Sequence, residues 1–169
     1  MPAYIALLRA VNVGGTGKLA MSDLREMCEA IGFTHVRTYI ASGNVVFESR
    51  LGEAAVRQQL EARLEAYAGK PVGVLVRTAE ELAAVLKANP FGEAAPDRTV
   101  AIFLDTPPAA DALSGASGVN SEEMALGPRE IYVHYPDGIG KSKLKIAAAK
   151  NGTARNMNTV AKLLEMAQA

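Results

Sequence analysis

Hydrophobic and polar positions along the first half of the chain follow two periods, that of a strand and that of a helix. Residues 3–11 are almost continuously apolar, as is typical of a strand buried on both faces. Residues 35–41 alternate, Ser42-Gly43-Asn44 is a turn signal, and residues 44–48 return as a strand, so the pattern predicts a hairpin. Residues 72–77 predict a fourth strand.

Two stretches between these strands have the helical period. Their apolar positions are Leu24, Met27, Cys28 and Ile31 in the first helix, and Val56, Leu60, Leu64 and Tyr67 in the second, over about 53–68. Ser22 or Asp23 can cap the first helix, with Glu26 placed to reach back, and Gly32 ends it. Gly69-Lys70-Pro71 ends the second helix. The order strand, helix, strand, strand, helix, strand predicts a ferredoxin-like unit over residues 1–77 of an α+β protein.

This topology has a consequence for polar residues that are distant in sequence. The first two strands are parallel and the third lies between them, so the loop after the first strand should lie beside the hairpin turn. That loop is rich in glycine and carries polar side chains. The residues predicted to meet at this edge and bind a ligand are Arg9, Asn12, Gly14, Gly15, Lys18, Ser42, Gly43 and Asn44.

Residues 78–169 predict a second, smaller α+β unit that packs on the first without a flexible linker. We expect helices over 79–87, 109–114 and about 155–167, and strands over 99–104, 123–126 and 129–135. Gly127-Pro128 suggests a hairpin between the last two strands. No residue-level similarity links this half to the first, so an internal duplication is an open alternative.

Composition and charge narrow the class of protein. The chain has 169 residues, of which 49% are hydrophobic, enough for one domain or two small units with a sizeable core. The formal net charge is zero, which argues against general electrostatic binding to nucleic acid or membranes. The charges are segregated, because residues 137–169 hold six Lys or Arg and two Asp or Glu. This basic tail either attracts anions or is an ordinary solvated helix.

The tail contains a second candidate binding region. Lys141, Ser142 and Lys143 follow a glycine-bearing loop, and Arg155 and Asn156 lie at the predicted start of the last helix. Ammonium and guanidinium groups and helix N-termini all favour anions, although an asparagine there can also be a simple cap.

The glycine-rich loop is not a nucleotide-binding P-loop. When its Gly17-Lys18 is aligned with that motif, Asn12 falls on the first glycine and Leu19 on the required hydroxyl residue. What remains is a weaker expectation, that its backbone N–H groups form an anion-binding nest.

Signals for catalysis and cofactors are few. His35 and His134 are far apart, Cys28 falls on the inner face of its helix, and no cysteine–histidine cluster has metal spacing, so we expect no metal and no cofactor. Asp137 is the nearest candidate base, and catalytic residues and enzyme activity stay open. A single cysteine excludes an intramolecular disulfide, and without a signal or membrane-spanning pattern we expect a cytoplasmic protein.

Three motifs in order resemble one bacterial family. They are residues 7–15, residues 36–47 and residues 135–144, and the run 153–160 belongs to the same pattern. Together they resemble the bacterial family called domain of unknown function 1697. The resemblance implies a two-part α+β protein whose first part is ferredoxin-like, and it implies no established activity. Met157 stands where the family usually has tryptophan.

These observations favour a binding module for an anionic ligand, namely a phosphorylated small molecule, a nucleotide or a short nucleic-acid segment. Nucleic acid has the weaker support, because aromatic residues are scarce on the predicted strands. One alternative is an enzyme that acts on a phosphorylated substrate. Another is a protein-interaction scaffold in which the polar turns are structural. The sequence indicates no membrane partner and specifies no oligomeric state.

Overall fold

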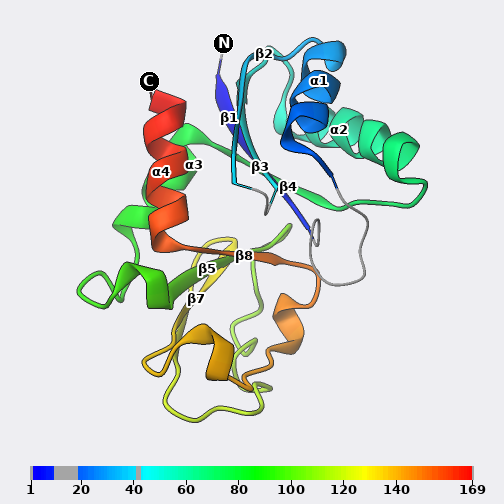
Figure 1. Ribbon diagram of the computed structural model, residues 1–169. Helices are drawn as coiled ribbons and strands as arrows, with labels where there is room; N and C mark the ends of the chain where they lie inside the picture. The colour runs from blue at the N-terminus through cyan, green and yellow to red at the C-terminus, as the bar shows by residue number, and fades with distance from the viewer. Residues whose placement is uncertain (1, 10–18, 41–42, 169) are drawn as a thin grey trace. The chain divides into compact units, whose positions relative to one another are not determined.

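The computed structural model describes residues 2–9, 19–40 and 43–168 (Figure 1). These residues form four α-helices and two antiparallel four-stranded sheets, which confirms the predicted α+β class. Within the same residues, no helix combines the length and apolar character needed to cross a membrane.

The chain divides into two compact units. The first comprises Met1–Leu82 together with Leu163–Ala169, and the second comprises Ala83–Lys162. Sequence analysis placed the boundary between residues 77 and 78, whereas this division falls inside helix α3 (Ala79–Lys87) and inside helix α4 (Met157–Gln168). In the first unit Arg37 Nη1 donates a hydrogen bond to the carbonyl of Met166, at the C-terminal end of α4, where a cation is favoured.

The sheet of the first unit has the predicted strand arrangement. Its strands are β1 (Ala3–Leu8), β2 (Thr34–Tyr39), β3 (Asn44–Glu48) and β4 (Val74–Thr78), in the order β2-β3-β1-β4. Strand β3 pairs antiparallel with both β1 and β2, so β1 and β2 run parallel. The amide of Leu8 donates to the carbonyl of Gly43 at 2.8 Å, which places the end of β1 beside the hairpin, as predicted.

Helices α1 (Met21–Ile31) and α2 (Glu53–Ala68) lie on the same side of this sheet (Figure 1). Their buried positions are those that the helical period predicts: Leu24, Met27 and Cys28 in α1, and Val56, Leu60 and Leu64 in α2. On the strands and their flanks, the rings of Phe33 and Phe47 stack 4.2 Å apart in the same core. Left-handed glycines end both helices, Gly32 at φ 107° and Gly69 at φ 74°, as predicted.

Two predictions about these helices are wrong. Tyr67 is 49% exposed instead of buried, and at the surface its hydroxyl donates to Asp23 Oδ2 at 3.0 Å. Neither Ser22 nor Asp23 caps α1, since the cap position is Ala20, which forms no side-chain cap bond. Asp23 therefore lies inside the first turn, where its charge faces the positive end of the helix dipole.

The second unit contains strands β5 (Thr99–Phe103), β6 (Glu123–Leu126), β7 (Glu130–His134) and β8 (Thr153–Asn156). Strands β6 and β7 form the predicted hairpin. The helix predicted over 109–114 is wrong, because residues 110–115 form consecutive turns. Strand β8 escaped prediction, since Thr-Ala-Arg-Asn has no apolar alternation and becomes a strand through its pairing with β5. Helix α4 consequently begins at Met157 and not at about residue 155.

The two sheets are topologically equivalent. The second has the order β6-β7-β5-β8, which corresponds strand by strand to β2-β3-β1-β4, and all pairings are antiparallel. The bond from the Leu8 amide to Gly43 has its counterpart in a bond from the Leu104 amide to the Arg129 carbonyl, also 2.8 Å long. The same sheet topology is therefore built twice without residue-level similarity.

The last strands of the two sheets end in the same way. Thr78 pairs with Tyr4, and its hydroxyl accepts the amide of Glu81 at 3.1 Å, which caps α3. The equivalent Asn156 accepts the amide of Thr159 at 2.9 Å and caps α4. One residue earlier, each strand holds a buried arginine, Arg77 or Arg155, whose Nη1 donates to the preceding carbonyl, at 3.0 and 2.9 Å.

The two units differ in what connects their strands. The first unit has α1 between β1 and β2 and α2 between β3 and β4. At the equivalent places the second unit has the segment 104–122, which contains turns and bends, and the segment 135–152, whose only helices are the short 3₁₀ helices η2 (Ile139–Lys141) and η3 (Ala147–Ala149). We refer to these two segments as the first and second connecting loops.

Burial of Cys28 makes its thiol unreactive. Desolvation raises the pKa of this thiol to about 12, far above the ordinary value of about 8.5. Because the thiolate is the nucleophile, we expect Cys28 of the folded protein to react with a thiol reagent at pH 8 at least a hundredfold more slowly than in urea. Equal rates in the folded and unfolded protein would contradict this burial.

A candidate ligand pocket in the second unit

A pocket of about 460 Å³ lies between the first and second connecting loops of the second unit. Its lining residues come from both loops: Gly118, Asn120 and Glu122 from the first, and Tyr135, Asp137, Gly138, Lys141, Ser142 and Lys143 from the second. The pocket thus contains three residues that the sequence predicts to bind a ligand, Lys141, Ser142 and Lys143, and the candidate base Asp137.

Backbone contacts fix the two loops to each other. Ser117 and Lys145 exchange two hydrogen bonds, from each amide to the other's carbonyl, at 2.9 and 2.8 Å. The next residue, Gly118, has a φ of +70° and lies so close that an added Cβ would be 2.1 Å from the carbonyl oxygen of Lys143. Only glycine fits this position without displacing the second loop.

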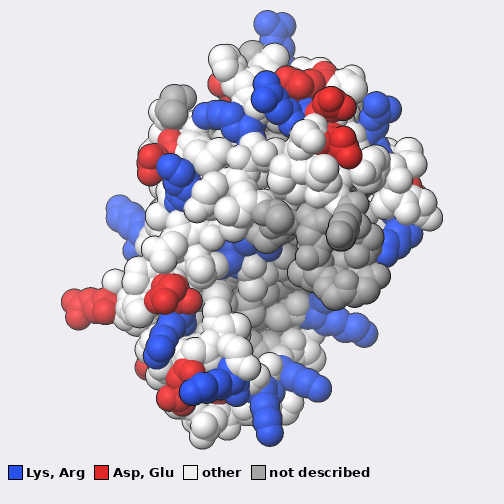
Figure 2. Space-filling model, viewed as in Figure 1, with Lys and Arg blue, Asp and Glu red and all other residues white. Residues whose placement is uncertain are grey.

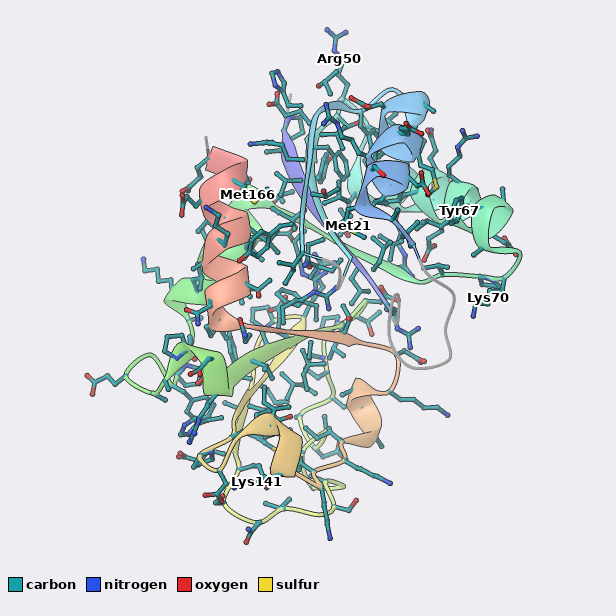
Figure 3. All side chains as sticks on the ribbon, viewed as in Figure 1. Met21, Arg50, Tyr67, Lys70, Lys141 and Met166 are labelled. Atoms are coloured by element: carbon teal, nitrogen blue, oxygen red, sulfur yellow. The ribbon has the colours of Figure 1, made fainter. Side chains whose placement is uncertain are left out.

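Internal hydrogen bonds shape the second connecting loop. The amide of Gly138, at φ 91°, donates to the carbonyl of Tyr135 at 3.0 Å, which turns the chain after β7. The amide of Ser142 donates to the carbonyl of Ile139 at 3.1 Å and closes η2. Lys141 ends this short helix, as labelled in Figure 3, and both it and Lys143 are exposed. The loop therefore presents two ammonium groups from a backbone that is held at several points.

Two carboxylates of the pocket are also held by hydrogen bonds. Glu122 accepts one from the amide of Asn120 at 2.8 Å and one from the hydroxyl of Ser142 at 3.0 Å. These bonds, that of the Asn120 amide above all, lower the pKa of the Glu122 carboxyl below its ordinary value, so the group is ionised at neutral pH. Asp137 Oδ2 accepts the hydroxyl of Ser121 at 2.6 Å.

Tyr135 supplies the aromatic part of the lining. Its side chain is half-buried and packs against the core of the second unit. Burial, followed by the negative charge of Glu122, raises the pKa of its phenol above the ordinary value. The neutral phenol is therefore the form present at physiological pH.

A second set of predicted ligand residues belongs to the first unit, at the glycine-rich loop and the hairpin turn. Asn12, Gly14, Gly15, Lys18 and Ser42 lie outside the described residues. The amide of Arg9 donates to the carbonyl of Gly73 at 2.9 Å, and a Cβ on Gly73 would lie 2.9 Å from Arg9 Cδ, so the arginine stem runs along this glycine.

The hairpin residues next to that edge have structural roles. Gly43 adopts φ 91° in the turn, which accounts for glycine there. Asn44 is completely buried, and its Nδ2 donates to the carbonyl of Tyr39 at 2.9 Å, which ties the two ends of the hairpin together. The Asn44 side chain therefore has a structural role in the hairpin turn.

Arg155 and Asn156 lie in β8 and not at the pocket. Arg155 is 7% exposed, and its Nη1 donates to Thr153 Oγ1 at 2.7 Å and to the Ala154 carbonyl at 2.9 Å. Burial lowers the pKa of its guanidinium to about 10. The Oδ1 of Asn156 caps α4, the structural alternative that the sequence left open.

Sequence reasoning missed the first wall of the pocket. Gly118, Asn120 and Glu122 have no motif, and the Gly/Ser-rich composition of 114–121 indicates only a loop. Their place in the pocket follows from the bridge between Ser117 and Lys145. These two residues are 28 positions apart, so a local sequence pattern does not indicate that they pair.

Other polar features of the described residues are weaker candidates. A larger pocket along α2 is lined by Glu53, Glu61, Glu65 and Arg57, but Glu61 accepts the amide of Val74 at 3.0 Å and pairs with Arg57 at 3.5 Å. Groups that could hold a metal ion, of three or more His, Cys, Asp or Glu, do not occur in the part of the chain that the structure describes.

The fold and pocket define a two-unit α+β protein with a polar cavity in its second unit. The chain belongs to the family described as protein of unknown function (DUF1697), whose model matches residues 1–132. That match ends before two of the motifs, residues 135–144 in the second connecting loop and residues 153–160 in β8 and α4.

The fold is similar to that of a solved structure, the conserved bacterial protein SP0830 from Streptococcus pneumoniae. The two chains are 24% identical, 98% of each is covered, and the TM-score is 0.82. At this level of identity the similarity shows the fold alone. A comparison with curated proteins found no match.

Gly118→Ala tests the loop contact that builds the pocket. We expect it to destabilise the protein by about 2 kcal/mol, because the added methyl group meets the Lys143 carbonyl and the left-handed backbone disfavours alanine. Urea unfolding measures the change in the free energy of unfolding. The matched control is Gly115→Ala, where an added Cβ meets nothing within 4 Å. Equal stability of the two variants would show that the loops do not depend on this contact.

Proposed function

We propose that this protein binds a small ligand with an anionic group, such as a phosphorylated metabolite or a nucleotide, in the pocket of the second unit. The observation that carries the proposal is the convergence of Lys141 and Lys143 on one cavity whose walls are fixed by backbone bonds. A fixed cavity is favourable because little conformational freedom is lost when the ligand binds.

The size of the pocket and its charges support a small-molecule ligand. A volume of about 460 Å³ lies in the range of small-molecule sites. A charge-assisted hydrogen bond contributes roughly 1.5–3 kcal/mol, so two lysine contacts correspond to dissociation constants from millimolar to tens of micromolar.

The surface charge supports a small anion over a long nucleic acid. Basic and acidic side chains lie next to one another on the face shown in Figure 2. A nucleic-acid surface usually has a stripe of one sign, because affinity comes from many phosphate contacts. The local arrangement of two lysines fits one or two phosphate groups better.

We also make proposals about the fold of the first unit, the location of the protein in the cell and the other predicted ligand residues. We propose that the first unit is a ferredoxin-like module, which the strand order β2-β3-β1-β4 and its antiparallel pairing support. We also propose a cytoplasmic location. Binding by Arg9, Asn12, Gly14, Gly15, Lys18, Ser42, Gly43 and Asn44 stays a prediction.

The double variant Lys141→Ala/Lys143→Ala tests the proposed function. We expect it to weaken binding of inorganic phosphate and of ribose 5-phosphate at least tenfold, because both ammonium donors are removed. Isothermal titration calorimetry on the full chain measures the dissociation constants. Lys70→Ala is the control, since Lys70 is an exposed lysine of the first unit and is not part of the pocket lining. Unchanged binding in the double variant, or no binding by the unaltered protein, would refute the proposal.

A further inference from the structure

We infer that the ligand of this pocket carries hydroxyl groups beside its anionic group, as a sugar phosphate or the ribose phosphate of a nucleotide does. This inference rests on the proposed function and specifies the ligand class of the same site. It follows from the carboxylates of the pocket, which an anion alone would not use.

The charges of the lining are balanced. The ammonium groups of Lys141 and Lys143 are matched by the carboxylates of Glu122 and Asp137. A bare anion is attracted by the first pair and repelled by the second. A ligand that also brings hydrogen-bond donors to the carboxylates gains interactions with both kinds of group, so it binds more tightly than the anion alone.

The carboxylates are oriented to accept such donors. Ser121 holds Asp137 through Oδ2, and each oxygen of a carboxylate has two lone pairs, which leaves Oδ1 for a ligand. Ser142 and the Asn120 amide hold Glu122 in the same manner, one on each oxygen. Because both groups are held before binding, accepting a ligand hydroxyl costs little side-chain entropy.

Hydroxyl groups suit this lining better than a ligand ammonium group. A positive charge placed near Asp137 would also lie in the pocket of Lys141 and Lys143 and would be repelled by them. A hydroxyl is neutral, donates to a carboxylate and accepts from a lysine at once. Several adjacent hydroxyls can therefore form hydrogen bonds with a lining that contains both carboxylates and ammonium groups.

The cavity also has room for more than a phosphate group. Its volume of about 460 Å³ is many times the roughly 30 Å³ that one water occupies in the liquid. The half-buried ring of Tyr135 gives one apolar surface, against which the C–H face of a sugar can pack. Size, the aromatic surface and the paired carboxylates all point to a phosphorylated, polyhydroxylated ligand.

Isothermal titration calorimetry on the full chain tests the proposed ligand class. The three probes are inorganic phosphate, ribose 5-phosphate and O-phosphoethanolamine. We expect ribose 5-phosphate to bind at least tenfold more tightly than inorganic phosphate and more tightly than O-phosphoethanolamine. Asp137→Ala should weaken ribose 5-phosphate about tenfold and should not weaken inorganic phosphate, which also shows that the variant is folded. Asp111→Ala is the control, because Asp111 is an exposed aspartate of the same unit outside the pocket.

The outcomes separate this inference from the proposed function. Equal affinity for phosphate and ribose 5-phosphate, or tighter binding of O-phosphoethanolamine, overturns the hydroxyl class while an anion site remains. An Asp137→Ala variant that keeps the full affinity for ribose 5-phosphate overturns the assigned role of the carboxylate. Failure of all three phosphates to bind the unaltered protein overturns the proposed function itself.

Discussion

The pocket depends on one close backbone contact, the approach of Gly118 to the carbonyl of Lys143 beside the two hydrogen bonds between Ser117 and Lys145. Neither connecting loop has a long helix or a strand ladder of its own between these points. Joined there, they hold the lysines and the carboxylates at fixed places around one cavity. The chemistry of the site therefore follows from a contact between two glycine-bearing loops and not from a rigid helix.

The repeated sheet topology explains why this cavity belongs to the second unit. In the first unit, α1 and α2 fill the connections and bury Leu24, Leu60 and Leu64 against their sheet. In the second unit the equivalent connections are loops. Polar side chains of both loops line a pocket that lies between them. The first unit thus uses its connections for a hydrophobic core, whereas the second uses them for part of its core, through Leu113 and Ile146 among others, and for the proposed ligand site.

Much of the fold was predictable from local patterns, because hydrophobic period and turn residues act locally. The strands of the first unit, both of its long helices and the β6–β7 hairpin follow from such patterns. Strand β8 does not, since Thr153–Asn156 is a strand only through its partner β5. The bond from Tyr67 to Asp23 joins two different helices, so no single-segment pattern contains it.

The candidate site was predictable in part for the same reason. Lys141, Ser142 and Lys143 stood out by charge and by their glycine-bearing loop, and the structure gathers them with Asp137. Asn120 and Glu122 could not be predicted, because their place at the pocket follows from contacts between the two loops. Arg155 and Asn156 resembled ligand residues by type, and the structure places them in β8, outside the pocket lining, where Arg155 is buried and Asn156 caps α4.

An NMR titration of the uniformly ¹⁵N-labelled full chain with ribose 5-phosphate tests the central claim most directly, because each backbone amide reports on its own surroundings. The account predicts that the largest saturable shift changes occur at the amides of Gly118, Asn120, Gly138 and Lys141–Lys143. Saturable changes confined to the first unit, around Arg9 and Gly43, or no saturable change at all, would contradict it.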